Sequence, residues 1–261
     1  MNERAAIEIF REKVREVIDD PALRDTEVKV RIKPLTPQEA IGNPLRRDYP
    51  IIEGKERVIE ATILGSRGQA FTDSPANYTG RLDEVMSMEL SDSSDRAVFL
   101  AAANAVLAHL GLAKGTVHCR DEAPEECAKE MAETARRRGV KSVGLIGLNP
   151  AIAEALVKEF GAGCVSITDL NPDNIGRDRF GVMVGNGKKD LAGLIDRSDL
   201  VVITGTTLAN GTYDGILRLV RTSGKEQVLY GITAAGFCVV MGVERWCFRA
   251  REGSCGDNSV C

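Results

Sequence analysis

The chain is poor in aromatic residues and in histidine, and it carries no excess of positive charge. Aromatic residues make up 5% of its 261 positions, and only two positions are histidine. So few aromatic side chains argue against a stacking platform for single-stranded nucleic acid. The net charge of −4, with Lys and Arg spread along the chain, argues against binding to a duplex. We therefore expect no nucleic-acid partner.

Long apolar runs are also missing. The most apolar stretch, Ala97 to Ala113, is short for a bilayer span and contains Asn104 and His109, so it predicts a buried helix. Residues 1–20 are charged and amphipathic, without the apolar core and cleavage site of a secretory signal. We therefore expect a cytoplasmic protein without a membrane partner. Its seven cysteines are then expected to be reduced.

The first part of the chain reads as an α+β domain, to about residue 120. Apolar residues at helical spacing predict a helix near residues 3–18, and alternation predicts strands at 26–32 and 57–64. The polar stretches 41–56 and 65–80 are expected to be loops. Long polar loops in a compact domain are often functional.

From residue 121 to about residue 250, strands alternate with helices. Buried strands are expected at 141–148, 163–170, 199–205 and 227–233, with helices at 124 onward, 149–160, 190–198 and 210–220. This alternation predicts βαβ units and a doubly wound parallel sheet. The overall fold class is therefore α/β, with an α+β domain over 1–120 and an α/β domain over 121–250. The tail, 251–261, is polar and expected to be mobile.

The strand-turn-helix "VGLIGLNPAIAEAL" resembles a nucleotide-binding turn. Gly144 and Gly147 stand where a dinucleotide fold places its phosphate-binding turn, and Asp169 ends the next strand at the distance of a ribose-binding carboxylate. The third glycine is missing, and Pro150 after the expected cap Asn149 removes one backbone N–H. The glycines are equally explained by close packing of helix against strand, so binding of a nucleotide or S-adenosylmethionine stays open.

A hydroxyl-rich segment, "ITGTTLANGTYDG", follows another predicted parallel strand. Ligands of open α/β sheets bind at this end of the strands. Asn210 or Thr212 can cap the next helix, whose free N–H groups suit an anion. The alternative is an ordinary βα loop that happens to be rich in threonine. The candidate ligand residues here are Thr204, Gly205, Thr206 and Thr207.

Two further motifs carry charged or sulfur-containing side chains. In "GNPLRRDYP", Arg46 and Arg47 with Asp48 can grip a carboxylate or phosphate, or they form a solvated turn. In "TVHCRDEAPEEC", the adjacent residues His118 and Cys119 suit a soft metal by type but point to opposite faces of an extended chain. Cys127 falls near the first turn of the next predicted helix, where the helix dipole favours a thiolate, or it is an inert buried residue. Toward the C-terminus, the residues that either bind metal, cross-link or are unpaired thiols are Cys247, Cys255 and Cys261.

Taken together, seven stretches resemble the putative heavy-metal chelation family, a group of prokaryotic proteins first described as a domain of unknown function. They occur in order from about residue 40 to about residue 240: "IGNPLRRDYPIIEGKE", "GQAFTD", "NAVLAHLGL", "TVHCRDEAPEECA", "GLIGLNPAI", "TDLNPDNIG" and "TGTTLANGTYDGIL". The resemblance implies an N-terminal domain like that of enolase, a C-terminal Rossmann-like domain, and a site in the cleft between them.

The resemblance also implies which residues form that site. On the N-terminal side these are the ligand-binding candidates Asn43, Arg46, Arg47, Asp48, Gln69 and Thr72, together with Asp73. His118 and Cys119 lie at the hinge as candidate metal ligands. On the Rossmann-like side the resemblance implies Asn149, Asp169, Thr204, Gly205, Thr206, Thr207 and Asn210. Gly144 and Gly147 are cofactor-binding candidates from the spacing of the turn itself.

Three functions are compatible with these residues. The first, which we favour, is binding of a transition metal or a metal-chelating small molecule in the cleft. The second is an enzyme that acts on a small heteroaromatic or acidic substrate with a nucleotide-like cofactor, S-adenosylmethionine or NAD, and uses Asp73 or His118 as a general base. The third is a non-catalytic scaffold, disfavoured by the polar content of both sets of loops. Assembly into a homo-oligomer is left open.

Overall fold

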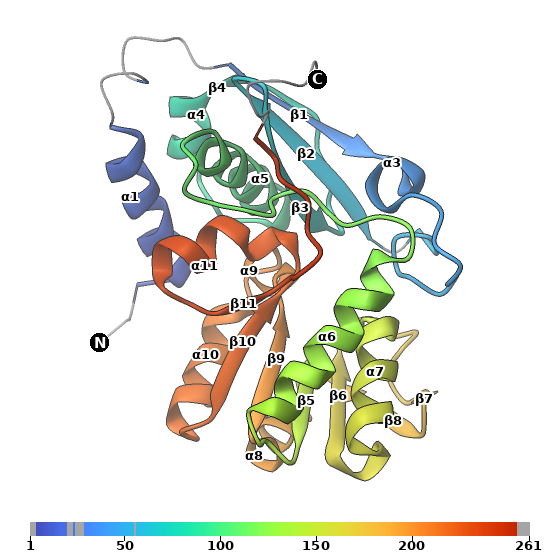
Figure 1. Ribbon diagram of the computed structural model, residues 1–261. Coiled ribbons are helices and arrows are strands. Elements are labelled where there is room, and N and C mark those ends of the chain that lie inside the picture. Colours follow the sequence, from blue (N-terminus) through green and yellow to red (C-terminus); the bar gives the residue numbers. More distant parts are fainter. Residues whose placement is uncertain (1–3, 20–22, 24–28, 55, 255–261) are drawn as a thin grey trace.

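A computed structural model describes residues 4–19, 23, 29–54 and 56–254 (Figure 1). The N-terminal part contains a four-stranded antiparallel sheet of order β3-β2-β1-β4. Its strands are β1 (Lys29–Leu35), β2 (Arg57–Ile63), β3 (Ser66–Thr72) and β4 (Tyr78–Arg81). The helices of this part are α1 (Ala6–Ile18), α3 (Pro37–Ile41), α4 (Leu82–Ser87) and α5 (Ser93–His109).

The predicted loop at 65–80 is wrong, because β3 and most of β4 lie within it. Leu64 and Gly65 both have positive φ, 49° and 80°, and join the paired residues Ile63 and Ser66 in a two-residue hairpin. Such a turn matches the twist of antiparallel strands. The polar residues of β3 interrupt the alternating pattern by which a strand is recognised in a sequence. The pairing of β3 with β2 determines its extended conformation.

The long apolar helix α5 is buried, as predicted, and covers the antiparallel sheet. Twelve of its residues are buried, and Asp92 caps its N-terminus by accepting a hydrogen bond from Asp95 N at 2.9 Å. Gly68 of β3 permits the close approach, since a Cβ atom there would lie 2.2 Å from the backbone N of Ala105. A helix that is apolar on all sides needs partners on all sides.

The second sheet has seven strands in the order β11-β10-β9-β5-β6-β8-β7. All neighbouring pairs are parallel except β7 and β8. The strands are β5 (Val143–Ile146), β6 (Val165–Asp169), β7 (Asp178–Arg179), β8 (Val182–Asn186), β9 (Leu200–Thr204), β10 (Glu226–Tyr230) and β11 (Arg245–Trp246). Counted along the chain, the order reverses between β5 and β9, as it does in doubly wound sheets.

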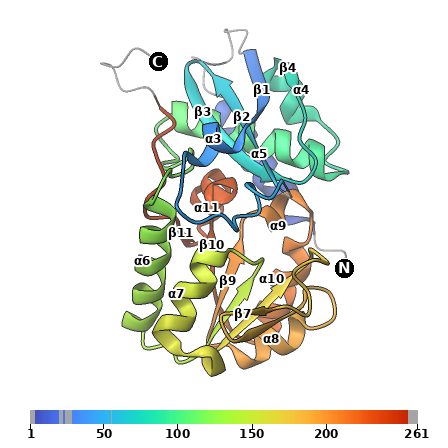
Figure 2. The same ribbon diagram turned by 90° about the vertical axis from the view of Figure 1, so that its right-hand side faces the viewer.

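Helices cover both faces of this sheet (Figure 2). The helices α6 (Ala123–Arg137) and α7 (Pro150–Phe160) pack against each other, while α8 (Leu191–Arg197) contacts α10 (Tyr213–Thr222). Two shorter helices follow β9 and β10, namely α9 (Thr206–Ala209) and α11 (Ala235–Met241). The predicted α/β class, with an antiparallel part followed by a parallel sheet, is confirmed. The short elements β7, β8, β11, α3, α4, α9 and α11 were not predicted.

The two parts share two apolar clusters, each built from residues of both parts. The ring of Phe10 in α1 lies edge-on to Phe99 of α5, at 5.5 Å between centroids, and to Phe237 of α11, at 5.4 Å. The predicted domain boundaries near residues 120 and 250 stay predictions. In the part of the chain that the structure describes, no helix is long and apolar enough to cross a membrane.

Asn104, the polar residue in the middle of α5, joins the two sheets. Its Nδ2 donates to Gln69 O at 2.9 Å and to Ile232 O at 3.0 Å, and its Oδ1 accepts from Gly236 N at 2.7 Å. A buried amide is tolerated when its donors and acceptor are paired, as they are here. Asn104 therefore fixes β3 against the turn that follows β10.

Candidate functional site

A cavity of about 930 Å³ lies between the two sheets. Its floor consists of the turns that follow β5, β6, β9 and β10, all at the carboxyl ends of parallel strands. Its other walls come from the segment before β2, the end of β3 and His118. Open α/β sheets bind ligands at this position, where the strand order reverses. A cavity of this size suits a small organic molecule.

The turn between β5 and α7 approaches β9 closely. Gly147 has a φ of 84°, and a Cβ atom there would lie 2.5 Å from Thr204 Cγ2. The predicted cap is confirmed, since Asn149 Oδ1 accepts a hydrogen bond from Ile152 N at 3.2 Å. Gly144 does not line the cavity, because it packs under α8, where a Cβ atom would lie 2.5 Å from Leu194 Cδ2.

Asp169 connects two of the turns that form the floor. Its Oδ2 accepts from Leu148 N at 2.7 Å, and its Oδ1 accepts from Asn171 N at 2.6 Å. An ionised carboxylate has about four lone-pair sites, so each oxygen keeps capacity for a ligand. Asp169 both shapes the floor of the cavity and lines it.

The threonine-rich segment lines the cavity but is not a loop throughout, because Thr206–Ala209 forms the short helix α9. The Oγ1 atoms of Thr204 and Thr206 lie 3.1 Å apart, and Thr207 Oγ1 donates to Thr204 O at 2.7 Å. The predicted capping of α10 differs as well. Thr212 is the N-cap residue without a side-chain cap bond, and Asn210 Oδ1 instead accepts from Thr212 N at 3.1 Å.

His118 faces the cavity as a neutral imidazole. Its Nδ1 lies 2.5 Å from Cys119 O, and a carbonyl oxygen can only accept, so Nδ1 carries the proton and Nε2 carries the lone pair. Burial lowers the pKa of His118 to about 4, and the charge of Arg251 acts in the same direction. The ring of Phe71 lies edge-on to the imidazole at 5.2 Å.

Gln69 and Cys119 lie behind His118 rather than in the lining. Gln69 is 1% exposed, and its Oε1 accepts from His118 N at 2.8 Å. The Cys119 thiol is buried on the Nδ1 side of the imidazole, 3.9 Å from that nitrogen, and burial raises its pKa to about 12. These two predicted site residues therefore touch His118 and not the cavity.

Glu56 is a lining residue that sequence reasoning missed. It is half-buried, and burial, together with the negative charges of Asp169 and Asp73, raises its pKa to about 7. Asp73 is exposed at the rim, where its Oδ1 accepts from Ser74 Oγ at 3.0 Å. The one signal in the sequence that could have identified Glu56 is its position directly before β2, because the polar stretch 41–56 contains several other charged residues.

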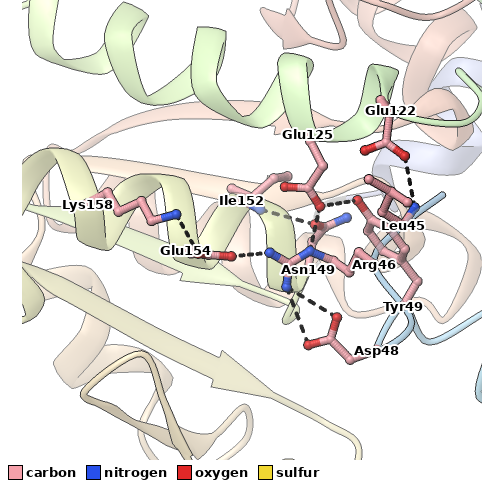
Figure 3. A network of polar contacts seen from close by, with 10 residues as sticks. All are labelled: Leu45, Arg46, Asp48, Tyr49, Glu122, Glu125, Asn149, Ile152, Glu154 and Lys158. Atoms are coloured by element: carbon pink, nitrogen blue, oxygen red, sulfur yellow. Dashed lines mark hydrogen bonds and ion pairs between the residues drawn. The ribbon is translucent and has the colours of Figure 1, made fainter.

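The side chains of the predicted arginine motif do not line the cavity. Arg46 instead lies in a network of carboxylates between this segment and the helices α6 and α7 (Figure 3). The guanidinium of Arg46 contacts Glu125 at 2.5 Å, Asp48 at 3.2 Å and also Glu154. Tyr49, which does line the cavity, donates to the same Glu125 at 2.9 Å. Arg46 and Tyr49 thus fasten the segment 42–56, which we call the cover segment, onto α6 and α7, while Asp48 pairs with Arg46 within the segment.

Of the remaining predicted residues, Thr72 and Gly205 line the cavity, and Arg47 is exposed outside it. Asn43 is also exposed, and its backbone N donates to Asp121 Oδ1 at 2.9 Å. Among the described residues, no group of three or more His, Cys, Asp and Glu side chains is arranged to hold a metal ion. Cys255 and Cys261 lie outside the described part of the chain.

Comparison with known proteins adds a family to this geometry. Residues 130–240 match the model of the family DUF364, described as putative heavy-metal chelation. This region is similar to the putative heavy-metal chelation family. The resemblance seen in the sequence motifs is thereby confirmed. No curated protein matches the chain.

Two solved structures of this family are similar to the chain. One is a protein of unknown function from Pyrococcus horikoshii, 16% identical, which covers 88% of this chain and 80% of its own, with a TM-score of 0.51. The other, from Desulfitobacterium hafniense DCB-2, is 15% identical over 71% of this chain and 73% of its own, with a TM-score of 0.44. The first likeness shows a shared fold.

The match to the putative heavy-metal chelation family covers only part of the cavity wall. The turns after β5, β6, β9 and β10 lie inside the matched region. Glu56, Asp73 and His118 lie before it. The side chains that can take up protons or donate electron pairs from the opposite wall therefore come from the part of the chain that the family match does not reach.

Proposed function

We propose that the cavity binds a metal-chelating small molecule and that His118 donates its Nε2 electron pair to the chelated metal. The observation that carries the proposal is the tautomer of His118. Histidines that bind metals usually donate their other ring N–H to a carboxylate or a backbone carbonyl, and His118 Nδ1 has Cys119 O as such a partner at 2.5 Å. The low pKa of His118 favours the unprotonated Nε2 that a metal requires.

The lining supports an organic ligand rather than a bare ion. Apolar side chains such as Ile51, Phe71 and Leu148 alternate with threonine hydroxyls and asparagine amides around the cavity. This mixture is typical of sites that enclose a small molecule and orient it through a few polar groups. The metal would be cargo that arrives with most of its ligands already in place, and one imidazole would complete its coordination.

The charges around the cavity support the same ligand class. Glu56, Asp73 and Asp169 contribute carboxylates, and Lys188 contributes one cation. A positively charged metal complex would offset the repulsion among the carboxylates. Imidazole and carboxylate donors together suit divalent transition metals such as zinc, nickel or iron. The name of the family, putative heavy-metal chelation, agrees with this choice.

Elemental and mass analysis of native protein, purified without chelators, tests the proposal. We expect a transition metal together with a small organic compound in the same preparation. Replacement His118→Asn should remove the metal, and His109→Asn should not, because His109 is exposed at the end of α5 and is the other histidine of the chain. Retention of the metal by His118→Asn would refute the role of His118.

A second candidate function is an enzyme with a nucleotide-like cofactor. It is favoured by the reversal of strand order between β5 and β9 and by Asp169 at the end of β6, the positions that Rossmann-like folds use for a dinucleotide. Asp73 or His118 would then serve as the proton acceptor. Calorimetry with S-adenosylmethionine and NAD discriminates between the two functions, since binding of either compound supports the enzyme.

A further inference from the structure

Asparagines line the floor of the cavity, and three of them use the same atom to hold their own turn. Asn149 Oδ1 accepts from a backbone N–H further along the chain at 3.2 Å, and Asn171 Oδ1 does so at 3.0 Å. Asn210 Oδ1 accepts from the backbone N–H of Thr212 at 3.1 Å. A backbone N–H can only donate, so each of these bonds identifies the amide oxygen as the atom turned toward the backbone.

The amide nitrogens of these three residues are therefore left for a ligand. Within the part of the chain that the structure describes, nothing accepts a hydrogen bond from Nδ2 of Asn149, Asn171 or Asn210. A fourth asparagine, Asn174, is 6% exposed and lines the cavity, and no described residue forms a hydrogen bond with its amide. Buried polar side chains are nearly always paired, so Asn174 indicates that a molecule bound in the cavity supplies its partner.

The free donors form a row along the floor of the cavity. The strand order β9-β5-β6-β8 places Asn210, then Asn149, then Asn171 and Asn174 after three neighbouring strands. Lys188 follows β8 and continues the row with an ammonium group, the one cation among the described lining residues. Neighbouring strands lie about 4.8 Å apart, so the row is wider than a single carboxylate. A ligand that satisfies it presents acceptor oxygens at several positions.

We propose that the small molecule bound in the cavity carries carboxylates, at least one of which lies at Lys188, and that the asparagine Nδ2 groups bind its acceptor oxygens. The inference rests on the proposed function, because it names the chemical class of the chelating compound. Carboxylates suit the row better than phosphates do. Neutral amides and one lysine, with no arginine among the described lining residues, offer little charge to a dianion.

The acidic side chains of the cavity agree with this orientation of the ligand. Glu56 and Asp73 belong to the antiparallel part and line the wall that carries His118. Asp169 lies on the floor, but each of its oxygens already accepts a backbone N–H, at 2.7 and 2.6 Å. The ligand therefore lies with its metal toward His118 and its free carboxylates toward the parallel sheet.

Substitution of an asparagine by aspartate reverses one donor and leaves the turn intact. Asn210→Asp keeps an oxygen that accepts from Thr212 N and replaces Nδ2 by a negatively charged oxygen. Asn186→Asp is the matched control, because Asn186 Oδ1 accepts from Lys188 N at 2.8 Å in the same way and Asn186 does not line the cavity. Lys188 is exposed, so Lys188→Gln provides a second test if Asn210→Asp fails to fold.

Calorimetry on the full chain, dialysed free of small molecules, uses citrate, nitrilotriacetate and trimethyl citrate as probes. We expect at least one of the two acids to bind without metal, and trimethyl citrate, whose carboxylates are esterified, not to bind. Asn210→Asp and Lys188→Gln should each weaken binding of the acid about tenfold or more, and Asn186→Asp less than about twofold. No binding of either acid, or equal affinity in the wild type and both cavity variants, would overturn the inference.

Nickel(II) added to the same titrations separates this inference from the function proposed for the cavity. If the acids bind and respond to Asn210→Asp while nickel(II) adds no affinity, the role of the metal is wrong and the preference for carboxylates stands. If the nickel(II) complex of nitrilotriacetate binds, loses affinity in His118→Asn and is unaffected by Asn210→Asp and Lys188→Gln, the preference for carboxylates is wrong and the role of His118 stands.

Discussion

Glu56 makes the stability of the protein depend on pH in an unusual direction. Most carboxylates in folded proteins are stabilised in their charged form, whereas Glu56 lies half-buried in a cavity wall beside Asp169 and Asp73, and its pKa rises from an ordinary 4.5 to about 7. Its proton is thus bound more tightly in the folded protein than in the unfolded chain. The variant Glu56→Gln keeps the size of the side chain and removes the charge.

The magnitude follows from linkage between proton binding and folding. Below pH 4.5, Glu56 is protonated in both states, and the stabilising contribution of the bound proton is fully present. As the pH rises from about 4.5 to about 7, Glu56 ionises in the unfolded chain but stays protonated in the folded protein, so the free energy of unfolding falls. Above pH 7 the carboxyl is ionised in both states, and the free energy of unfolding falls no further. At about 1.4 kcal/mol per tenfold change in proton affinity, and with screening by solvent at the cavity, the loss is roughly 2 to 3 kcal/mol.

Urea unfolding of both proteins between pH 4 and pH 8 measures this contribution. We expect equal free energies of unfolding near pH 4 and a variant that is more stable by roughly 2 to 3 kcal/mol at pH 8. Glu53, exposed on the same cover segment, provides a matched control, and Glu53→Gln should follow the wild type within about 0.5 kcal/mol. If the free energies of unfolding of Glu56→Gln and the wild type differ by the same amount at every pH, the claim that the folded protein raises the pKa of Glu56 is wrong.

Three further substitutions probe the contacts that shape the cavity, each measured as a free energy of urea unfolding. Arg46→Met leaves three carboxylates facing each other and should lose about 2 to 4 kcal/mol and expose the cover segment to proteolysis, whereas Arg47→Met should change little. Gly68→Ala forces a Cβ atom against the backbone of α5 and should lower the free energy of unfolding by about 3 kcal/mol. An unchanged free energy of unfolding would contradict this close contact. Asn104→Leu leaves buried backbone groups of both parts without a hydrogen-bond partner and should lower the free energy of unfolding by at least about 3 kcal/mol. Asn149→Ala removes only a helix cap and should lower it by about 1 kcal/mol.

The sequence predicted the parallel sheet well because its signals are local. Apolar runs such as Val143–Ile146 and caps such as Asn149 and Asp92 decide where strands and helices begin from neighbouring residues alone. It failed at β3, where glycine, arginine and glutamine interrupt the expected pattern and the pairing with β2 determines the strand. Hairpin pairing is a non-local effect that weakly apolar strands do not reveal.

The same distinction explains which candidate site residues reach the cavity. Residues at the ends of parallel strands, such as Asp169 and Thr204, line it because the sheet dictates where those ends lie. The side chain of Arg46 is occupied by Glu125 and Glu154, which belong to helices whose position relative to the cover segment no local pattern encodes.

The cover segment therefore has two consequences for any ligand of the cavity. Its Tyr49 and Glu56 line the cavity, while Arg46 holds its outer side on α6 and α7. A ligand that enters by displacing this segment must break the Arg46 contacts, and a cationic ligand regains part of that free energy by replacing the proton on Glu56. Because the cover segment carries both Arg46 and Glu56, a ligand that displaced it would break the Arg46 ion pairs and change the surroundings of the Glu56 carboxyl in the same step.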